Sequence, residues 1–305
     1  GLTFEGTTPK STAISYEFAH ACEFVDGEIR SCAGTGLSIV EGCYQTRILR
    51  NRFETIDNGA LMAHGSANPG DGREITRETQ ISYNKFFDCG GINIYANFTL
   101  MTTISHNYIT KTRGRYGIDV GGWKNLEEAI DGGYLVEYNH LDNVQMDADD
   151  SGAIKTAGIT FNSVVRRNLI HNVHAGFFND NVAFWFDNMS NGWISEENIY
   201  YNLEQGEWKL CAAMIEDNTY QNNFKIEAPT NSPEIIIDGE PQFSESNLQV
   251  ESASKTGSGA ILAGSIIRVT ADVTNTGATG IAPVELYVDG KIKERKLLYL
   301  IFMQK

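Results

Sequence analysis

The sequence lacks several features that define common functional classes. It has five cysteines but no C-x-x-C pair, so we expect free thiols rather than a zinc site. No run of eighteen apolar residues occurs, and we therefore expect no membrane span. Basic residues are also few, with 24 Lys and Arg against 39 Asp and Glu, a net charge of −15. This charge disfavours nucleic acid as a partner, because a phosphate backbone would be repelled.

Helical periodicity is missing as well, which argues against alternating strands and helices. Hydrophobic residues make up 41% of the chain, enough for a sizeable core. Short apolar runs follow glycines at 59–62, 91–95, 117–120 and 152–154. These runs have the length and composition of strands.

A second pattern recurs between those runs: an apolar residue, two others, an asparagine, one residue and another apolar residue. It includes Asn51, Asn84, Asn107, Asn139, Asn168 and Asn218, with Asn198 slightly out of phase. The steps vary from 20 residues (198 to 218) to 33 (51 to 84). Such steps match a coil that turns once per repeat and carries insertions.

The repeats predict an all-β protein whose residues 1–240 form a right-handed parallel β-helix. One coil cannot bury its own apolar face, but coils stacked about 4.8 Å apart share a continuous core. The asparagines are expected at equivalent turns, hydrogen-bonded along the stack and in the left-handed backbone conformation.

Acidic residues gather in the segment Met146–Thr156, which contains Asp147, Asp149 and Asp150 ahead of a short apolar strand. One repeat later another apolar strand ends on Asp187. Two carboxyl groups on neighbouring coils suit glycosidic hydrolysis, in which one donates a proton and the other is base or nucleophile. The alternative is that each Asp caps a turn through its own backbone. Asp150 precedes its strand and Asp187 ends its own, so the offset between them stays open.

Aromatic residues near these acids suggest how a sugar would be held. Trp123, Trp185 and Tyr116 offer flat faces for sugar rings, and Lys155 is a further candidate for substrate contact. Long insertions at 66–75 and 121–133 would form the walls of a groove. Ordinary packing against the coil is the alternative for each aromatic residue.

From Leu2 to about Phe224 the chain resembles right-handed β-helix carbohydrate-active proteins of the pectate-lyase-like superfamily, and most of all the glycoside hydrolases among them. The likeness rests on Asp150-Ser-Gly-Ala-Ile154 and on Phe184-Trp-Phe-Asp187. It implies catalytic roles for Asp150 and Asp187 only. Apart from the resemblance, Asp149 and Asp147 of the same acidic segment are substitutes for Asp150. The chain departs from the pattern at Lys155, where an aromatic residue is common, and at Phe184-Trp185, which replace Ile-Tyr.

The remaining residues, 241–305, predict a small β-sandwich. Alternating strands with turn signals occur at 264–277 and 284–290. They resemble part of a bacterial adhesion-related, immunoglobulin-like module, which implies a spacing or presenting role.

Three functions remain open from the sequence. The first is a secreted glycoside hydrolase acting on a plant or algal polysaccharide without a cofactor. The second is a polysaccharide lyase that uses Lys155 or Arg115 as base and binds calcium through Asp147, Asp149 and Asp150. The third is a non-catalytic carbohydrate-binding or adhesion protein. All three predict a polysaccharide partner and an extracellular or periplasmic location.

Overall fold

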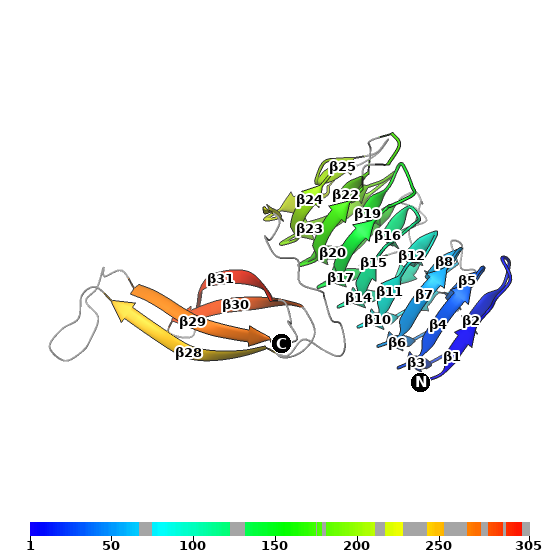
Figure 1. Ribbon diagram of the computed structural model, residues 1–305, viewed down its shortest axis with the longest axis horizontal. Coiled ribbons are helices and arrows are strands. Elements are labelled where there is room, and N and C mark those ends of the chain that lie inside the picture. The colour runs from blue at the N-terminus through cyan, green and yellow to red at the C-terminus, as the bar shows by residue number, and fades with distance from the viewer. Residues whose placement is uncertain are drawn as a thin grey trace. The chain divides into compact units, whose positions relative to one another are not determined.

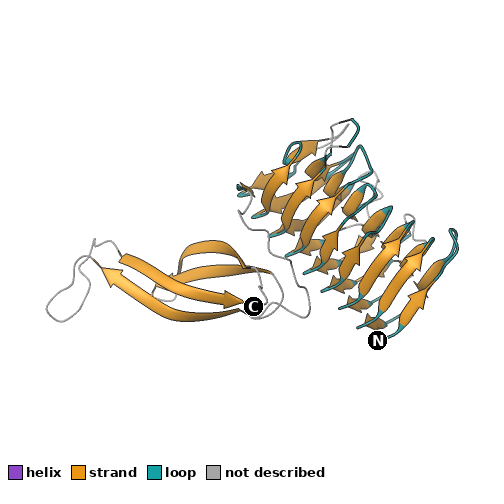
Figure 2. Ribbon diagram, in the orientation of Figure 1, coloured by secondary structure: helices purple, strands orange, loops and turns teal. Residues whose placement is uncertain are grey.

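The protein is described by a computed structural model that covers residues 1–66, 75–122, 132–174, 176–178, 181–210, 217–227, 243–252, 267–275, 280–288 and 291–300 (Figure 1). The chain divides into two compact units, Gly1–Thr230 and Asn231–Lys305. Within the residues described, all regular structure is strand (Figure 2).

The first unit is a right-handed parallel β-helix built from three parallel sheets, numbered here in the order in which each coil visits them. Sheet 1 contains β2 (Thr12–Glu17), β5 (Thr35–Val40), β8 (Gly59–His64), β12 (Ile92–Asn97), β16 (Tyr116–Val120), β19 (Gly152–Thr156), β22 (Val182–Phe186) and β25 (Trp208–Leu210). Sheet 2 contains β3 (Glu23–Val25), β6 (Arg47–Leu49), β10 (Gln80–Ser82), β14 (Thr103–Ser105), β17 (Leu135–Glu137), β20 (Ile159–Arg166), β23 (Asn191–Glu196) and β26 (Thr219–Gln221). Sheet 3 contains β1 (Thr3–Glu5), β4 (Glu28–Cys32), β7 (Arg52–Ile56), β11 (Lys85–Phe87), β15 (Tyr108–Thr110), β18 (His140–Val144), β21 (Leu169–Val173), β24 (Ile199–Leu203) and β27 (Phe224–Lys225). The short strands β9 (Thr76–Arg77) and β13 (Thr99–Leu100) pair with each other between sheets 1 and 2. The predicted parallel β-helix is therefore confirmed.

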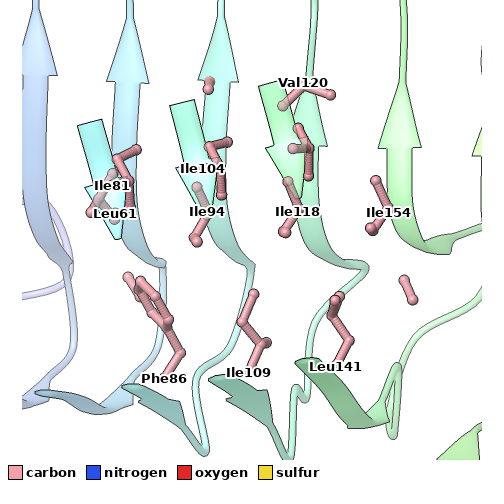
Figure 3. Packing of buried hydrophobic residues seen from close by; sticks show 14 of the residues in the cluster. Leu61, Ile81, Phe86, Ile94, Ile104, Ile109, Ile118, Val120, Leu141 and Ile154 are labelled. Atoms are coloured by element: carbon pink, nitrogen blue, oxygen red, sulfur yellow. The ribbon is translucent and has the colours of Figure 1, made fainter. Parts of the chain in front are cut away.

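The core runs along the inside of the stack. Leu61, Ile94, Ile118 and Ile154 occupy one register position on successive strands of sheet 1 and form a row (Figure 3). Rows from sheets 2 and 3 face it, and all these side chains are buried. Each such aliphatic side chain contributes roughly 1.5–3 kcal/mol when it is fully removed from water.

An asparagine ladder joins sheets 2 and 3 along the stack. The amide Oδ1 of Asn107 accepts hydrogen bonds from the backbone N and the Nδ2 of Asn84, both at 3.0 Å. The Nδ2 of Asn107 donates to Ile81 O at 2.9 Å and to Asn139 Oδ1 at 3.0 Å. The same contacts repeat at every member: Asn51, Asn84, Asn107, Asn139, Asn168 and Asn198, ending at Asn223.

Three details of the predicted series are wrong. Asn198 is in phase with the ladder, and Asn223 rather than Asn218 continues it. Asn218 instead accepts a hydrogen bond from the backbone N of Trp193 at 2.9 Å. The left-handed backbone belongs to the residue before each asparagine, for example His106 with φ of 56°.

The described residues of the second unit form two antiparallel pairs. Strand β28 (Phe243–Ser252) pairs with β29 (Ile267–Asn275), and β30 (Gly280–Val288) pairs with β31 (Lys291–Leu300). The immunoglobulin-like character of this unit stays a prediction. The unit begins at Asn231, ten residues before the boundary expected from sequence. Among the described residues, no helix is long and apolar enough to cross a membrane.

Candidate functional site

Charged side chains interrupt the outer face of sheet 1 at two neighbouring strands. In β16, Ile118 and Val120 enter the core, so the intervening Asp119 faces outward. Lys155 of β19 pairs with Asp119 in register and faces outward in the same way. Trp185 of β22 follows Lys155 in this row. The row therefore places an acid, a base and an indole on three consecutive coils.

Asp187 completes the group from the end of β22. Its backbone N donates to Thr156 O at 2.9 Å, which fixes the residue beside the end of β19. Lys155 Nζ lies 3.0 Å from Asp119 Oδ1 and 3.7 Å from Asp187 Oδ2. Because both oxygens contact one nitrogen, they are at most about 6.7 Å apart (3.0 Å plus 3.7 Å). Glycosidases that retain configuration separate their carboxyl groups by about 5–5.5 Å, and inverting enzymes by about 6.5–9.5 Å.

Burial makes the charges of this group unusual. The residues Asp119, Lys155 and Asp187 are only 3%, 6% and 6% exposed. One ammonium group can neutralise only one of two carboxylates, so a fully ionised group would keep one excess negative charge in a poorly solvated place. Burial raises the pKa of Asp119, against the opposing effect of Lys155, and the charge of Asp187 raises it further. The net effect is a pKa of Asp119 above its ordinary value, in spite of the 3.0 Å contact with Lys155 Nζ.

Two aromatic residues complete the surroundings. The Tyr116 ring lies 5.3 Å from Lys155 Nζ, and burial raises the pKa of its hydroxyl. Trp185 is 1% exposed, with Lys209 Nζ 4.3 Å from its ring centroid, so its ring is not an open platform for a sugar. Trp185 Nε1 is buried and has no hydrogen-bond partner among the described residues.

The structure does not bring Asp150 and Asp187 together. Strands β19 and β22 are in register, with Gly152 beside Val182 and Thr156 beside Phe186. Asp150 lies before the start of β19 and Asp187 lies after the end of β22, while the five-residue strand alone spans about 13 Å. The two acids therefore lie at opposite edges of sheet 1.

The other predicted site residues also separate from Asp187. Asp150 is exposed and accepts a hydrogen bond from Arg115 Nη2 at 2.7 Å. Asp149 is partly buried, and its Oδ1 accepts a hydrogen bond from the backbone N of Phe178 at 2.9 Å. Asp147 is exposed. Trp123, with most of both predicted wall loops, lies outside the described residues.

Asp119 is the functional candidate that sequence reasoning missed. Its signal was present in Gly117-Ile-Asp-Val120, where one charged residue interrupts an apolar strand. The strand itself was predicted, but the insertion between β16 and β19 hides which residue of the next coil lies beside Asp119.

A second polar cluster lies on the outer face of sheet 3. His140 Nε2 and His171 Nε2 are 2.7 Å apart, and His171 Nδ1 lies 3.2 Å from Asp142 Oδ1. Tyr201 stacks on His171 with ring centroids 4.3 Å apart. Burial lowers the pKa of His140 well below its usual range and that of His171 to about 4. Among the described residues, no group of three or more His, Cys, Asp or Glu is arranged to hold a metal ion.

Comparison with known proteins finds a solved structure of similar fold. No family model matches the sequence, and no curated protein matches it either. A solved structure described as "Glycoside hydrolase" is similar over 70% of this chain, with a TM-score of 0.59 and 20% identity. This likeness shows a shared fold, and the chain spans 38% of that protein's length. A second structure, "Siphovirus 9NA tailspike receptor binding domain", is 11% identical with a TM-score of 0.34, over 94% of this chain and 56% of that one.

Proposed function

We propose that the β-helix unit hydrolyses a glycosidic bond with Asp119 and Asp187 as its two carboxyl groups. The observation that supports this most is the pair of buried carboxyl groups on either side of Lys155, with contacting oxygens at most about 6.7 Å apart (3.0 Å plus 3.7 Å). Two acids in this range, with one of them protonated, are what glycosidic hydrolysis requires.

In this proposal Asp119 is the general acid. Burial raises the pKa of Asp119, which is the direction that a general acid requires, and the carboxyl proton is donated to the glycosidic oxygen as the bond to the leaving sugar breaks. Asp187 is the second carboxyl group, which as a carboxylate attacks the anomeric carbon or removes a proton from the attacking water. Lys155 offsets the charge of Asp187 and fixes the distance between the acids.

The substrate class follows from the outward placement of these groups. Sheet 1 continues over many coils on either side of this group, and such a long face favours a polysaccharide over a small sugar. The fold shared with a solved glycoside hydrolase is consistent with this chemistry, although the fold alone also hosts other functions. A plant or algal polysaccharide, met outside the cell, remains our proposal for substrate and location.

A polysaccharide lyase is the second candidate. The observation in its favour is the central position of Lys155, with Tyr116 nearby, because a lyase needs a base beside the uronate carbon and a proton donor for the leaving oxygen. Two carboxyl groups around Lys155 count against it, since they stabilise the protonated lysine and repel a uronate.

The reaction products distinguish these functions. Purified protein is incubated with neutral and uronate-containing polysaccharides, with and without a calcium chelator. Hydrolysis releases reducing ends without an ultraviolet-absorbing unsaturated sugar, and this is the expected result. An unsaturated product would establish the lyase instead, and binding without any product would establish the non-catalytic protein.

A further inference from the structure

Two adjacent phenylalanines stand in solvent on the turn that leads into β22. Phe177 is 84% exposed and Phe178 is 69% exposed. Their rings meet edge to face with centroids 5.2 Å apart and an interplanar angle of 82°. Neighbouring apolar side chains this exposed are unfavourable in water, and such features mark binding sites more often than single exposed residues do.

The turn is anchored to the preceding coil by buried polar groups. Asp149 Oδ1 accepts a hydrogen bond from Phe178 N at 2.9 Å. Asn181 Nδ2 donates to Ala148 O at 2.7 Å, and Ser151 Oγ donates to Asn181 Oδ1 at 2.8 Å. The side chains of Asn181 and Ser151 are fully buried. These contacts hold the turn to its neighbour while both rings project outward, which lowers the entropy lost when a ligand binds.

Glycine at 176 makes the anchoring tight. Gly176 has φ of 71°, and an added Cβ would lie 2.2 Å from Asp149 Oδ1 and 2.6 Å from Ala148 O. A side chain at this position would push the turn away from the 147–151 segment. Asp149 therefore holds this turn in place through its side chain.

The phenylalanine pair lies at the edge of sheet 1 where β22 begins, opposite to the edge that carries Asp187. It precedes β22, the strand that carries Trp185 and ends at Asp187, and β22 pairs with β19 and its Lys155. The strand separates the pair from Asp187 by about 13 Å. Only a ligand of several linked units could contact both.

We propose that Phe177 and Phe178 form a binding subsite for uncharged sugar rings of the polysaccharide chain, a proposal that rests on the proposed function. The apolar ring faces of sugars stack on aromatic side chains, and the exposed Asp147 beside the turn accepts hydrogen bonds from hydroxyl groups. The acids of the 147–150 segment repel polyanions, which selects a neutral chain over a polyuronate.

The test compares binding with turnover. Neutral hexasaccharides of glucan, xylan, mannan and galactan, and oligogalacturonate as the acidic probe, are titrated calorimetrically against the Asp187→Asn protein. The same titration is repeated with Phe177→Ala/Phe178→Ala, with Phe177→Tyr/Phe178→Tyr, and with Phe18→Ala as a matched exposed phenylalanine on the first coil, 50% exposed. Circular dichroism checks the fold of each variant.

We expect the double Ala variant to bind a neutral hexasaccharide about tenfold or more weakly, and the Tyr variant and the Phe18→Ala control to bind it normally. In the active protein the double Ala variant should raise KM for the polymer and leave kcat nearly unchanged. Unchanged affinity in the double Ala variant, no neutral oligosaccharide bound by any protein, or lost self-association instead of lost sugar binding would each overturn the subsite. If sugar binding depends on the phenylalanines but no hydrolysis is detected, the proposed function is wrong and the subsite is confirmed.

Discussion

Lys155 contributes both to the stability of the fold and to the candidate active site. It is the only cation that the described structure places between Asp119 and Asp187, and all three side chains are buried. Removing a lysine from such a group leaves two unpaired carboxyl groups, which costs more than the ion pair itself contributes.

We therefore expect Lys155→Met to lower the free energy of unfolding at pH 7 by about 3–5 kcal/mol. Without the lysine, the pKa values of the two acids in the folded protein lie above their values in the unfolded chain, so the folded variant binds more protons than the unfolded one. The difference in free energy of unfolding between the variant and wild type should therefore become smaller as the pH falls from 7 to 5. Urea unfolding at several pH values measures this. Lys111→Met, an exposed lysine over the Phe87 ring, should change stability by less than about 0.5 kcal/mol. An equal loss at pH 7 and pH 5 would contradict the account.

The His140–His171 pair predicts a separate dependence on pH. Its folded pKa values are lowered, that of His171 to about 4 from 6.5, so the unfolded chain binds protons that the folded protein excludes. The free energy of unfolding is therefore unaffected by protonation of these histidines above pH 6.5. It decreases as the pH falls from 6.5 toward 4, by up to about 1.4 kcal/mol per pH unit for each histidine. His140→Phe/His171→Phe should flatten this part of the stability curve, and His20→Phe, at an exposed position, should not. A curve that keeps its slope in the double variant would refute the assignment.

Single residues also show where sequence reasoning ends. The outward placement of Lys155 and Asp187 follows from strand alternation, and both were selected from the sequence. Their partner Asp119 was not selected. The loop between β16 and β19 determines which residues of the two strands pair, and the strand pattern does not reveal this register. Asp150 was selected for its motif, but it belongs to the turn before β19, and the strand separates it from Asp187.

Among the elements, the asparagine ladder was the most predictable. Its spacing identified the fold, since only a repeating turn returns the same side chain to one place. The error at Asn218 arose because Ile215-Glu-Asp-Asn218-Thr-Tyr220 matches the repeat pattern, whereas the asparagine that continues the ladder is Asn223, five residues later.

The ladder should be most sensitive in the middle of the stack. Asn107→Ala leaves buried partners in Asn84, Ile81 and Asn139 unsatisfied, so we expect a loss of about 2–4 kcal/mol in the free energy of unfolding. Asn223→Ala on the last coil should cost about 1 kcal/mol or less, because Asn223 is itself partly exposed and water can take the place of its amide. Equal losses at the two positions, measured by thermal and urea unfolding, would show that the ladder does not act as a stack of buried bonds.

At the scale of the whole molecule, the stacked coils contact mainly their neighbours. Terminal strands are poorly covered: β1 and β2 contain no buried residue, whereas every residue of β16, β19 and β22 is buried. Stability in such a stack is a sum of local and nearest-neighbour contributions.

Hydrogen exchange should therefore follow position in the stack. We expect the amides of β1 and β2 to exchange orders of magnitude faster than those of β16, β19 and β22, because opening the first coil breaks few buried contacts. Exchange measured by mass spectrometry after pepsin digestion resolves these strands. Equal protection of the amides in all coils would contradict this prediction, because it would show that the amides exchange only when the whole stack unfolds.

The central claim is that hydrolysis depends on Asp119 and Asp187, on either side of Lys155. The measurement that tests it most directly is kcat/KM on the best polysaccharide for Asp119→Asn, Asp187→Asn and Asp150→Asn, each checked for native circular dichroism. The account predicts a loss of at least about a hundredfold for the first two, since an amide cannot donate or accept the required proton. It predicts a change of less than about threefold for Asp150→Asn, whose carboxylate pairs with Arg115 at the opposite edge of the sheet. Full activity in Asp119→Asn, or loss confined to Asp150→Asn, would contradict it.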